Sequence, residues 1–287
     1  MPDRTTDALK FDATTHFGFG KNWAAYSRTV TEDDIQNAVR EMQRLFGRDD
    51  LAGARFLDIG CGSGIHTLAA LRLGAASVTA VDFDEKSVAT ASTLVGQWWT
   101  GSKPLIRQGN VFELTPAECG RFDIVYSWGV LHHTGDMWTA LDRAAALVDD
   151  GGTLAIALYR KTPMCGFWRW EKRRFTHGGA LFRGSAIGLF VAARFVRDVA
   201  RLKNPFTKIG AHNRKRGMKW YIDVLDWLGG YPYESARPED VVARLEAAGF
   251  RLKQMFKARR DLGILGSGNA EYVFEKRPPA EAAFKTP

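Results

Sequence analysis

Three glycines within one short turn are the feature that most constrains this 287-residue chain. The turn lies in Phe56-Leu-Asp-Ile-Gly-Cys-Gly-Ser-Gly64, between an apolar run typical of a strand and a stretch with helical spacing. Glycine permits a sharp bend and brings backbone N–H groups close to a ligand that a Cβ would exclude. The dinucleotide fingerprint G-x-G-x-x-G needs a small residue where Ile65 stands. The turn therefore predicts a flat or extended ligand and argues against a nicotinamide or flavin cofactor.

Short apolar runs alternate with helix-length stretches from Arg55 to Tyr159, and the alternation resumes near Arg237. Such alternation predicts parallel strands joined by right-handed crossovers, and so a doubly wound sheet. The predicted strands are residues 56–59, 78–81, 105–107, 122–126, 153–158, 250–257 and 270–275. The predicted helices between them are residues 65–73, 85–96, 137–147 and 237–248.

A further helix is predicted ahead of the first strand. Thr31 offers a hydroxyl to the first free backbone N–H groups, and the acids that follow it suit the positive end of the helix dipole. Ile35, Val39, Met42 and Phe46 recur at helical spacing. We expect these four side chains to form the buried face of the helix.

An acidic residue ends the second predicted strand. Asp82 follows the run Val78-Thr-Ala-Val and stands 22 residues after Gly60. A carboxylate at this strand tip accepts hydrogen bonds from two ribose hydroxyls. The pair of motifs predicts a nucleoside-containing ligand across the ends of the first two strands.

Taken in order, these motifs resemble those of the class I S-adenosylmethionine-dependent methyltransferases. The blocks that carry the resemblance are Asp58 to Gly64, Asp82, Gly109-Asn110-Val111 and Phe122 to Ser127. The blocks Gly129 to Thr134 and Leu147 to Thr153 are similar to the subgroup that methylates small molecules, including quinones and natural products. The resemblance implies a Rossmann-like, doubly wound α/β fold with seven strands, the last of them antiparallel, and S-adenosyl-L-methionine as cofactor.

The resemblance also implies which residues contact the cofactor. Asp58 and the glycine turn would face its methionine part, and Asp82 its ribose. Asn110 stands where the family often has Asp, and either side chain can hydrogen-bond an adenine amino group. The implied cofactor-binding residues are Asp58, Gly60, Cys61, Gly62, Gly64, Asp82, Phe83, Asn110, Val111, Ser127 and Trp128.

Two adjacent histidines are the candidate catalytic groups. Methyl transfer from a sulfonium is a direct displacement, so the enzyme mainly holds donor and acceptor in line, and a general base is optional. His132 and His133 follow the fourth predicted strand, on the cofactor side of the sheet. Either one acts as a base, with His133 favoured, or both belong to the pocket wall.

Aromatic residues in two loops are the candidates for enclosing the site. Phe19, Trp23 and Tyr26 lie ahead of the first predicted helix, where they would form either a lid over the cofactor or a plain packing segment. Tyr221 and Tyr233 flank a loop rich in glycine and aromatic residues, and are candidates for the acceptor pocket.

The segment after the fifth strand carries the positive charge of the chain. From Arg160 to Lys219, 16 Lys and Arg stand against two acids, whereas the whole chain has a net charge of +8. Arg194, Arg197 and Arg201 share one face of a predicted helix. Three readings remain open: a solvated helical cap, a cap that binds an acidic acceptor through groups such as Arg214, or a basic amphipathic helix on an anionic membrane that reaches a lipid-like acceptor.

These patterns predict four parts of the chain. They are an N-terminal helical lid segment (1–50), a methyltransferase core (51–160 and 236–277), a helical insertion that caps the acceptor (161–235) and a loose tail (278–287). The three cysteines lack metal or redox spacing, and no metal is expected. The sequence shows no signal-like or membrane-spanning stretch, so we expect a cytoplasmic protein, with peripheral contact to a membrane as an alternative.

The predicted function is O-methylation of a small or medium-sized molecule, with N- or C-methylation as alternatives. A nucleic-acid methylase is disfavoured because Ser127-Trp-Gly-Val130 stands where enzymes that methylate base amino groups carry Asn or Asp followed by Pro-Pro-aromatic. A non-catalytic protein that binds the cofactor without turnover is a third alternative.

Overall fold

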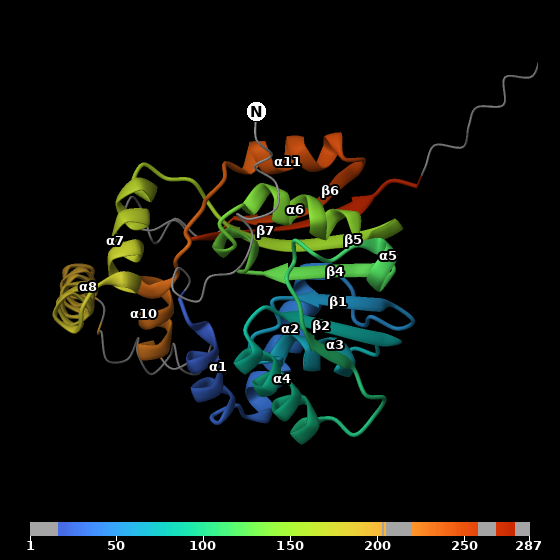
Figure 1. Cartoon of the computed structure of the whole chain (residues 1–287), viewed down its shortest axis with the longest axis horizontal. Coiled ribbons are helices and arrows are strands. Elements are labelled where there is room, and N and C mark those ends of the chain that lie inside the picture. The colour runs from blue at the N-terminus through green and yellow to red at the C-terminus, as the bar shows by residue number, and fades with distance from the viewer. Residues whose placement is uncertain (1–16, 203, 205–219, 258–267, 279–287) are drawn as a thin grey trace, which may run out of the picture.

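The computed structural model describes residues 17–202, 204, 220–257 and 268–278. A seven-stranded sheet in the order β3-β2-β1-β4-β5-β7-β6 runs through its centre (Figure 1). Strand β7 is antiparallel to both of its neighbours, and β1 to β5 pair in parallel. The predicted doubly wound sheet with an antiparallel last strand is confirmed. The strands are β1 (Arg55–Ile59), β2 (Ser77–Asp82), β3 (Leu105–Gln108), β4 (Phe122–Trp128), β5 (Val148–Tyr159), β6 (Phe250–Lys257) and β7 (Asn269–Lys276).

Helices bury apolar side chains against both faces of the sheet, which gives two separate core clusters. One cluster receives α2 (Glu32–Phe46), α3 (Ile65–Arg72) and α4 (Glu85–Trp98). The other receives α6 (Met137–Ala146) and α11 (Pro238–Ala247), with the short α5 (Pro116–Cys119) at its edge. A sheet that is covered on both faces presents its strand ends as the accessible edges, and ligands of such folds bind at the carboxyl ends.

The remaining helices gather beside the carboxyl ends of the strands. Figure 1 shows α7 (Cys165–His177), α8 (Ala180–Ala200) and α10 (Trp220–Gly229) grouped to one side of the sheet, with α1 (Phe19–Ser27) next to α10. A single 3₁₀ turn, η1 (Leu131–His133), follows β4. Between β5 and α11 the structure describes the helices α7, α8 and α10 together with irregular segments, and Arg160 and Ala236 form an isolated β-bridge.

Helix α2 begins as its sequence predicts but buries a slightly different face. The Thr31 hydroxyl accepts a hydrogen bond from the Asp34 N–H, and the Asp34 carboxylate accepts one from the Thr31 N–H, a capping box. The buried stripe consists of Ile35, Ala38, Met42 and Leu45. Val39 and Phe46, two of the four predicted positions, are only partly buried. The prediction missed the offset because alanine adds little to an apolar pattern.

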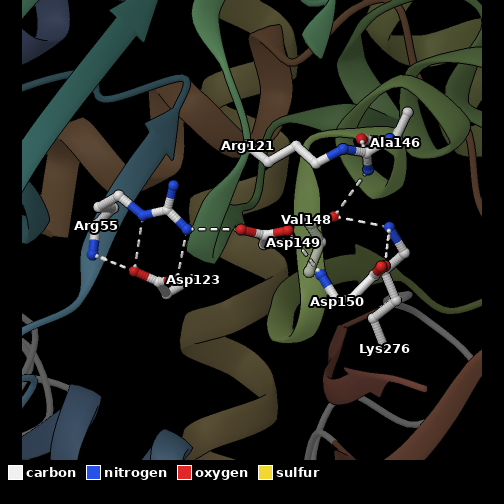
Figure 2. Close-up of polar contacts among 8 residues, drawn as sticks. All are labelled: Arg55, Arg121, Asp123, Ala146, Val148, Asp149, Asp150 and Lys276. Carbon is white, nitrogen blue, oxygen red and sulfur yellow. Dashed lines mark hydrogen bonds and ion pairs between the residues drawn. The ribbon is translucent and has the colours of Figure 1, made fainter. Parts of the chain in front are cut away.

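Strand β5 starts five residues before its predicted start at Thr153. After Val148 the strand continues with two acids and two glycines, so no apolar alternation marks this part, and side chains from other strands contact it instead (Figure 2). Arg55 of β1 forms an ion pair of 2.7 Å with Asp149, and the Lys276 ammonium of β7 donates to the Val148 carbonyl at 2.9 Å. This network lies at the amino ends of β1, β4 and β5, opposite the edge where ligands bind.

Within the described part of the chain, no helix is both long and apolar enough to cross a membrane. The same residues contain no group of three or more His, Cys, Asp and Glu side chains that could hold a metal ion.

Candidate active site

The glycine turn between β1 and α3 needs glycine at each of its three positions. Gly60, Gly62 and Gly64 have φ values of 79°, 56° and 81°, in the left-handed region that side chains with a Cβ avoid. Neighbours also fill the space beside them. A Cβ at these positions would approach Val130, Trp23 and Ala91, respectively, to 3.0 Å or less. The turn is therefore fixed by backbone conformation and by close packing together.

Asp82, at the end of β2, faces the glycine turn. One carboxylate oxygen accepts the Gly62 N–H at 2.8 Å, and the other accepts the Asp84 N–H at 2.9 Å. Burial raises the pKa of Asp82 to about 6, although both N–H bonds favour the charged form. The strand ends thus bring a carboxylate within one hydrogen bond of the turn, as the spacing predicts.

Asp58 and Cys61, which belong to the same motif as the glycine turn, point their side chains into the protein interior and not toward a ligand on the turn. The Asp58 carboxylate is buried and accepts the Thr67 hydroxyl of α3 at 2.6 Å, and burial raises its pKa to about 7. The Cys61 side chain packs in a small cluster with Ala80 and Ala91, and burial raises the pKa of its thiol. Only the backbone of Cys61 is left to meet a ligand.

The loop after β3 lies beside the end of β2. The Gly109 N–H donates to the Asp82 carbonyl at 2.9 Å, which places the next two residues near that carboxylate. The Asn110 side-chain oxygen accepts the Phe112 N–H at 3.2 Å, and Val111 is buried. Phe83 is half-buried in the neighbouring loop. The structure therefore gathers the predicted ribose and adenine residues at one edge.

The two candidates at the end of β4 turn their side chains elsewhere. Ser127 is fully buried and its hydroxyl donates to the Ile59 carbonyl at 3.0 Å. The Trp128 indole N–H donates to Glu271 of β7 at 3.1 Å, and its ring lies 6.0 Å from the ring of His66. Both side chains are thus engaged by other parts of the protein. A ligand beside the glycine turn would meet the backbone of this strand end.

Helix α1 covers the carboxyl end of the sheet and touches three parts of the site. Trp23 lies against Gly62, and the Gly20 N–H donates to the Asp84 carboxylate at 2.9 Å. The Phe19 ring lies 5.4 Å from the ring of His133. Tyr26 is buried against the α2 side of the core and supports Trp23 edge-on, with 6.2 Å between the rings. Of the three predicted lid residues, Trp23 lies on the glycine turn, Phe19 lies beside His133, and Tyr26 belongs to the core.

The two candidate histidines have different surroundings. His132 is buried, its ring lies 3.9 Å from that of Tyr159, and burial holds its pKa well below the usual value. His133 is half-buried, and its Nδ1 lies 2.7 Å from the Pro232 carbonyl oxygen. A carbonyl only accepts, so Nδ1 of the neutral ring carries the proton and Nε2 is the nitrogen that can accept one.

The three acceptor candidates in the segment after β5 have different surroundings. Tyr233 is buried, with its ring 5.3 Å from that of Tyr159 and its hydroxyl 3.4 Å from the Cys165 sulfur. Tyr221 is exposed. Arg214 lies outside the described residues.

Sequence reasoning named Tyr233 but missed the rest of the aromatic cluster beside the histidines and the lysine inside it. Tyr159 contacts both histidines, Trp227 and Tyr233, and the Lys172 ammonium lies 4.0 Å from the centre of the Trp227 ring. A signal was present in α7, where charged residues fall within an apolar stripe at helical spacing. The strong positive charge of the segment obscured it.

This strand order, with a glycine turn after β1 and a carboxylate ending β2, defines the class I methyltransferase type of α/β fold. Residues 57–156 match the family described as Methyltransferase domain. The crystal structure of magnesium protoporphyrin IX methyltransferase from Synechocystis PCC 6803 shares the fold. It has a TM-score of 0.50 and 18% identity, over 87% of this chain and 86% of that one.

Sequence relatives agree with the fold. A ubiquinone biosynthesis O-methyltransferase from Caulobacter sp. (strain K31) is 35% identical over 40% of this chain and 45% of the relative. The 27-O-demethylrifamycin SV methyltransferase of Amycolatopsis mediterranei (strain S699) is 30% identical over 52% of each. The chain thus spans about half the length of the curated relatives it matches. Residues 57–156 are a methyltransferase domain, and this part of the chain belongs to the class I S-adenosylmethionine-dependent methyltransferases.

Proposed function

We propose that the protein transfers the methyl group of S-adenosylmethionine to a hydroxyl group of a small molecule. The observation that carries the proposal is the junction of Asp82 and the glycine turn, where the carboxylate accepts the Gly62 N–H at 2.8 Å. A ribose needs such a carboxylate beside a turn that no Cβ obstructs. The names of the relatives, two of which are O-methyltransferases of a quinone pathway and of a rifamycin, support oxygen as the atom methylated.

Each part of the chain has a distinct task in this proposal. The cofactor supplies a methyl group on a positively charged sulfur. Asp82 accepts the ribose hydroxyls, Asn110 and Val111 border the adenine, and Asp58 holds α3 beneath the glycine turn through Thr67. Helix α1 excludes water, and residues 161–235 cap the acceptor.

The direct test measures binding and turnover in one preparation. Calorimetry with S-adenosylhomocysteine should give a one-to-one complex, and a methyl-labelled donor should transfer its label to a catechol acceptor. A protein that binds S-adenosylhomocysteine but transfers no label to any hydroxylated acceptor from a cell extract would be a binding protein. No affinity for the donor or its product would end the proposal.

We assign the role of general base to His133. Its Nδ1–H donates to the Pro232 carbonyl at 2.7 Å, so the ring is oriented and Nε2 can take the hydroxyl proton of the acceptor. His132 instead supports the wall, because burial holds its pKa well below the usual value and its ring packs against that of Tyr159 in a tilted arrangement.

Replacing His133 by Gln should lower kcat about 100-fold, the typical contribution of a positioned base. The affinity for S-adenosylhomocysteine should stay unchanged, because the imidazole acts on the acceptor. His132→Phe is the matched control: it keeps a flat ring against Tyr159 and should lower kcat far less. Steady-state kinetics with the labelled donor measures both, and equal losses in the two variants would contradict the assignment.

A lipid-like acceptor at an anionic membrane surface is the second candidate, and the surface of α8 favours it. Leu181, Leu189 and Val196 are 90%, 74% and 67% exposed on this helix. The surrounding segment, residues 160–219, is the strongly basic one. An exposed apolar stripe with basic neighbours is the pattern of helices that lie in the membrane interface. In this form of the proposal the acceptor carries an apolar chain.

Vesicles that contain phosphatidylglycerol should carry the protein upward in a flotation gradient, and neutral vesicles should not. Leu189→Glu should reduce the bound fraction about tenfold, since burial of one leucine contributes roughly 1.5–3 kcal/mol. Leu105→Glu is the control, because Leu105 is also exposed but lies on β3. Equal flotation of the two variants would exclude α8 as the contact.

A further inference from the structure

Helix α7 buries two ionisable side chains in the stripe that should be apolar. Its buried residues are Trp168, Glu171, Lys172 and Phe175, spaced as one helical face. Lys172 is 0% and Glu171 6% exposed. Within the described part of the chain, neither the ammonium nor either carboxylate oxygen has a hydrogen-bond partner. Buried polar groups in folded proteins are nearly always paired, so this arrangement calls for a partner beyond the described residues.

Three aromatic rings surround the Lys172 ammonium. Its distances to the ring centres are 4.0 Å for Trp227, 5.5 Å for Tyr233 and 5.9 Å for Trp168. The rings come from α7, from α10 and from the loop that follows α10. The indole N–H groups of Trp168 and Trp227 are also buried without an acceptor in the described residues. This aromatic cage therefore holds three polar groups that can donate hydrogen bonds and that meet no acceptor.

The cage adjoins the proposed base. Tyr159, at the end of β5, lies 5.7 Å from the ring of Trp227 and 5.3 Å from the rings of both Tyr233 and His133. One ring thus separates the caged ammonium from the imidazole at the end of β4. An acceptor bound beside the ammonium would therefore lie next to the ring that also contacts His133.

The charges suit an anion. Burial lowers the pKa of Lys172 and raises that of Glu171, and the charge of each neighbour opposes the shift of the other. A carboxylate beside the ammonium favours its charged form, and a protonated Glu171 adds no opposing charge. Aromatic rings around the ammonium offer faces on which a flat ligand can stack.

We propose that Lys172 and the cage of Trp168, Trp227 and Tyr233 form the acceptor subsite, and that it takes a hydroxylated aromatic ring bearing a carboxylate. The Lys172 ammonium and the indole N–H groups bind the carboxylate, and the ring hydroxyl lies toward His133. This assignment rests on the proposed function and specifies its substrate class. Entry requires α10 to move. The Asn22 amide of α1 donates to the Asp226 carboxylate of α10, and the Phe17 N–H, just before α1, donates to the Tyr231 carbonyl in the loop after α10.

Two probes that differ only in charge test the subsite. The full chain, saturated with S-adenosylhomocysteine, is titrated with 3,4-dihydroxybenzoate and with 3,4-dihydroxybenzamide, and quenching of tryptophan fluorescence reports binding. The wild type should bind the acid about 10- to 100-fold more tightly than the amide, the range expected for a hydrogen-bonded charge. Lys172→Met should bring the ratio to about one, and Lys172→Arg should restore part of it. S-adenosylhomocysteine affinity should stay unchanged in both variants.

Equal affinity of the wild type for acid and amide overturns the subsite, and so does failure to bind the acid. A preference for the acid that survives in Lys172→Met also overturns it. The wild-type ratio remains decisive where a variant fails to fold. The proposed function is tested separately on the same protein preparation, with the methyl-labelled donor in place of S-adenosylhomocysteine: label transferred to catechol without any preference for the acid leaves methyl transfer standing and removes the subsite. Absence of S-adenosylhomocysteine binding removes the proposed function itself.

Discussion

Asp82→Asn is expected to weaken binding of S-adenosylhomocysteine by about 100-fold. The carboxylate offers two charged acceptors to the ribose, and hydrogen bonds to charged groups contribute about 1.5–3 kcal/mol each. Asparagine keeps the shape and one acceptor oxygen, so the Gly62 N–H, which donates to Asp82 at 2.8 Å, still finds a partner. A loss of about 2.8 kcal/mol corresponds to two powers of ten in the dissociation constant, and calorimetry measures it directly.

The same side chain should make cofactor binding pH-dependent. Burial raises the pKa of Asp82 to about 6 in the free protein. Hydrogen bonds from two ribose hydroxyls favour the charged form of the Asp82 carboxylate, so its pKa falls when the cofactor binds. Below pH 6 the carboxylate of the free protein must therefore lose a proton before it binds the ribose. Affinity should therefore be constant above about pH 7 and decline by as much as tenfold for each pH unit below 6. The decline should be absent in Asp82→Asn.

Asp123→Asn is the control for both measurements. Asp123 also lies on a central strand and accepts hydrogen bonds from Arg55, but it stands at the amino end of β4, as Figure 2 shows. Its replacement should leave cofactor affinity and its pH profile unchanged. If both variants bound S-adenosylhomocysteine as the wild type does, the ribose would have to bind elsewhere.

The second large effect is expected on stability. Gly64→Ala should lower the free energy of unfolding by about 3 kcal/mol. The φ of 81° costs alanine about 1–2 kcal/mol, and the new Cβ would lie 2.8 Å from the Ala91 backbone, so overpacking adds about 1–3 kcal/mol. Urea unfolding, followed by circular dichroism, gives the difference.

Gly74→Ala separates the two causes. Gly74 has almost the same φ, 83°, but a Cβ there would meet nothing closer than 3.9 Å. This variant should lose only the conformational part, about 1–2 kcal/mol. Equal losses in the two variants would show that close contact between the glycine turn and α4 contributes nothing to the stability of the turn.

Several features of the site followed from local sequence. Glycine spacing, the acid at the end of β2 and the strand–helix alternation each rest on short-range chemistry, and the sheet confirms the fold they predict. Apolar alternation failed at β5, whose first residues depend on Arg55 and Lys276 from other strands. Local sequence favoured His133 but could not show that its ring is oriented, because the Pro232 carbonyl beside its Nδ1 comes from a loop distant in the chain.

The sequence alone thus determined the order of strands and helices, the glycine turn and the position of the carboxylate that we propose binds the ribose. Backbone conformation and strand ends are set by residues close in the chain. Only the tertiary structure decided that Trp23 packs on Gly62, that His133 rather than His132 is oriented by a carbonyl, and that Lys172 lies within three aromatic rings. Burial and pairing depend on residues distant in the sequence, and no local pattern encodes which of them meet.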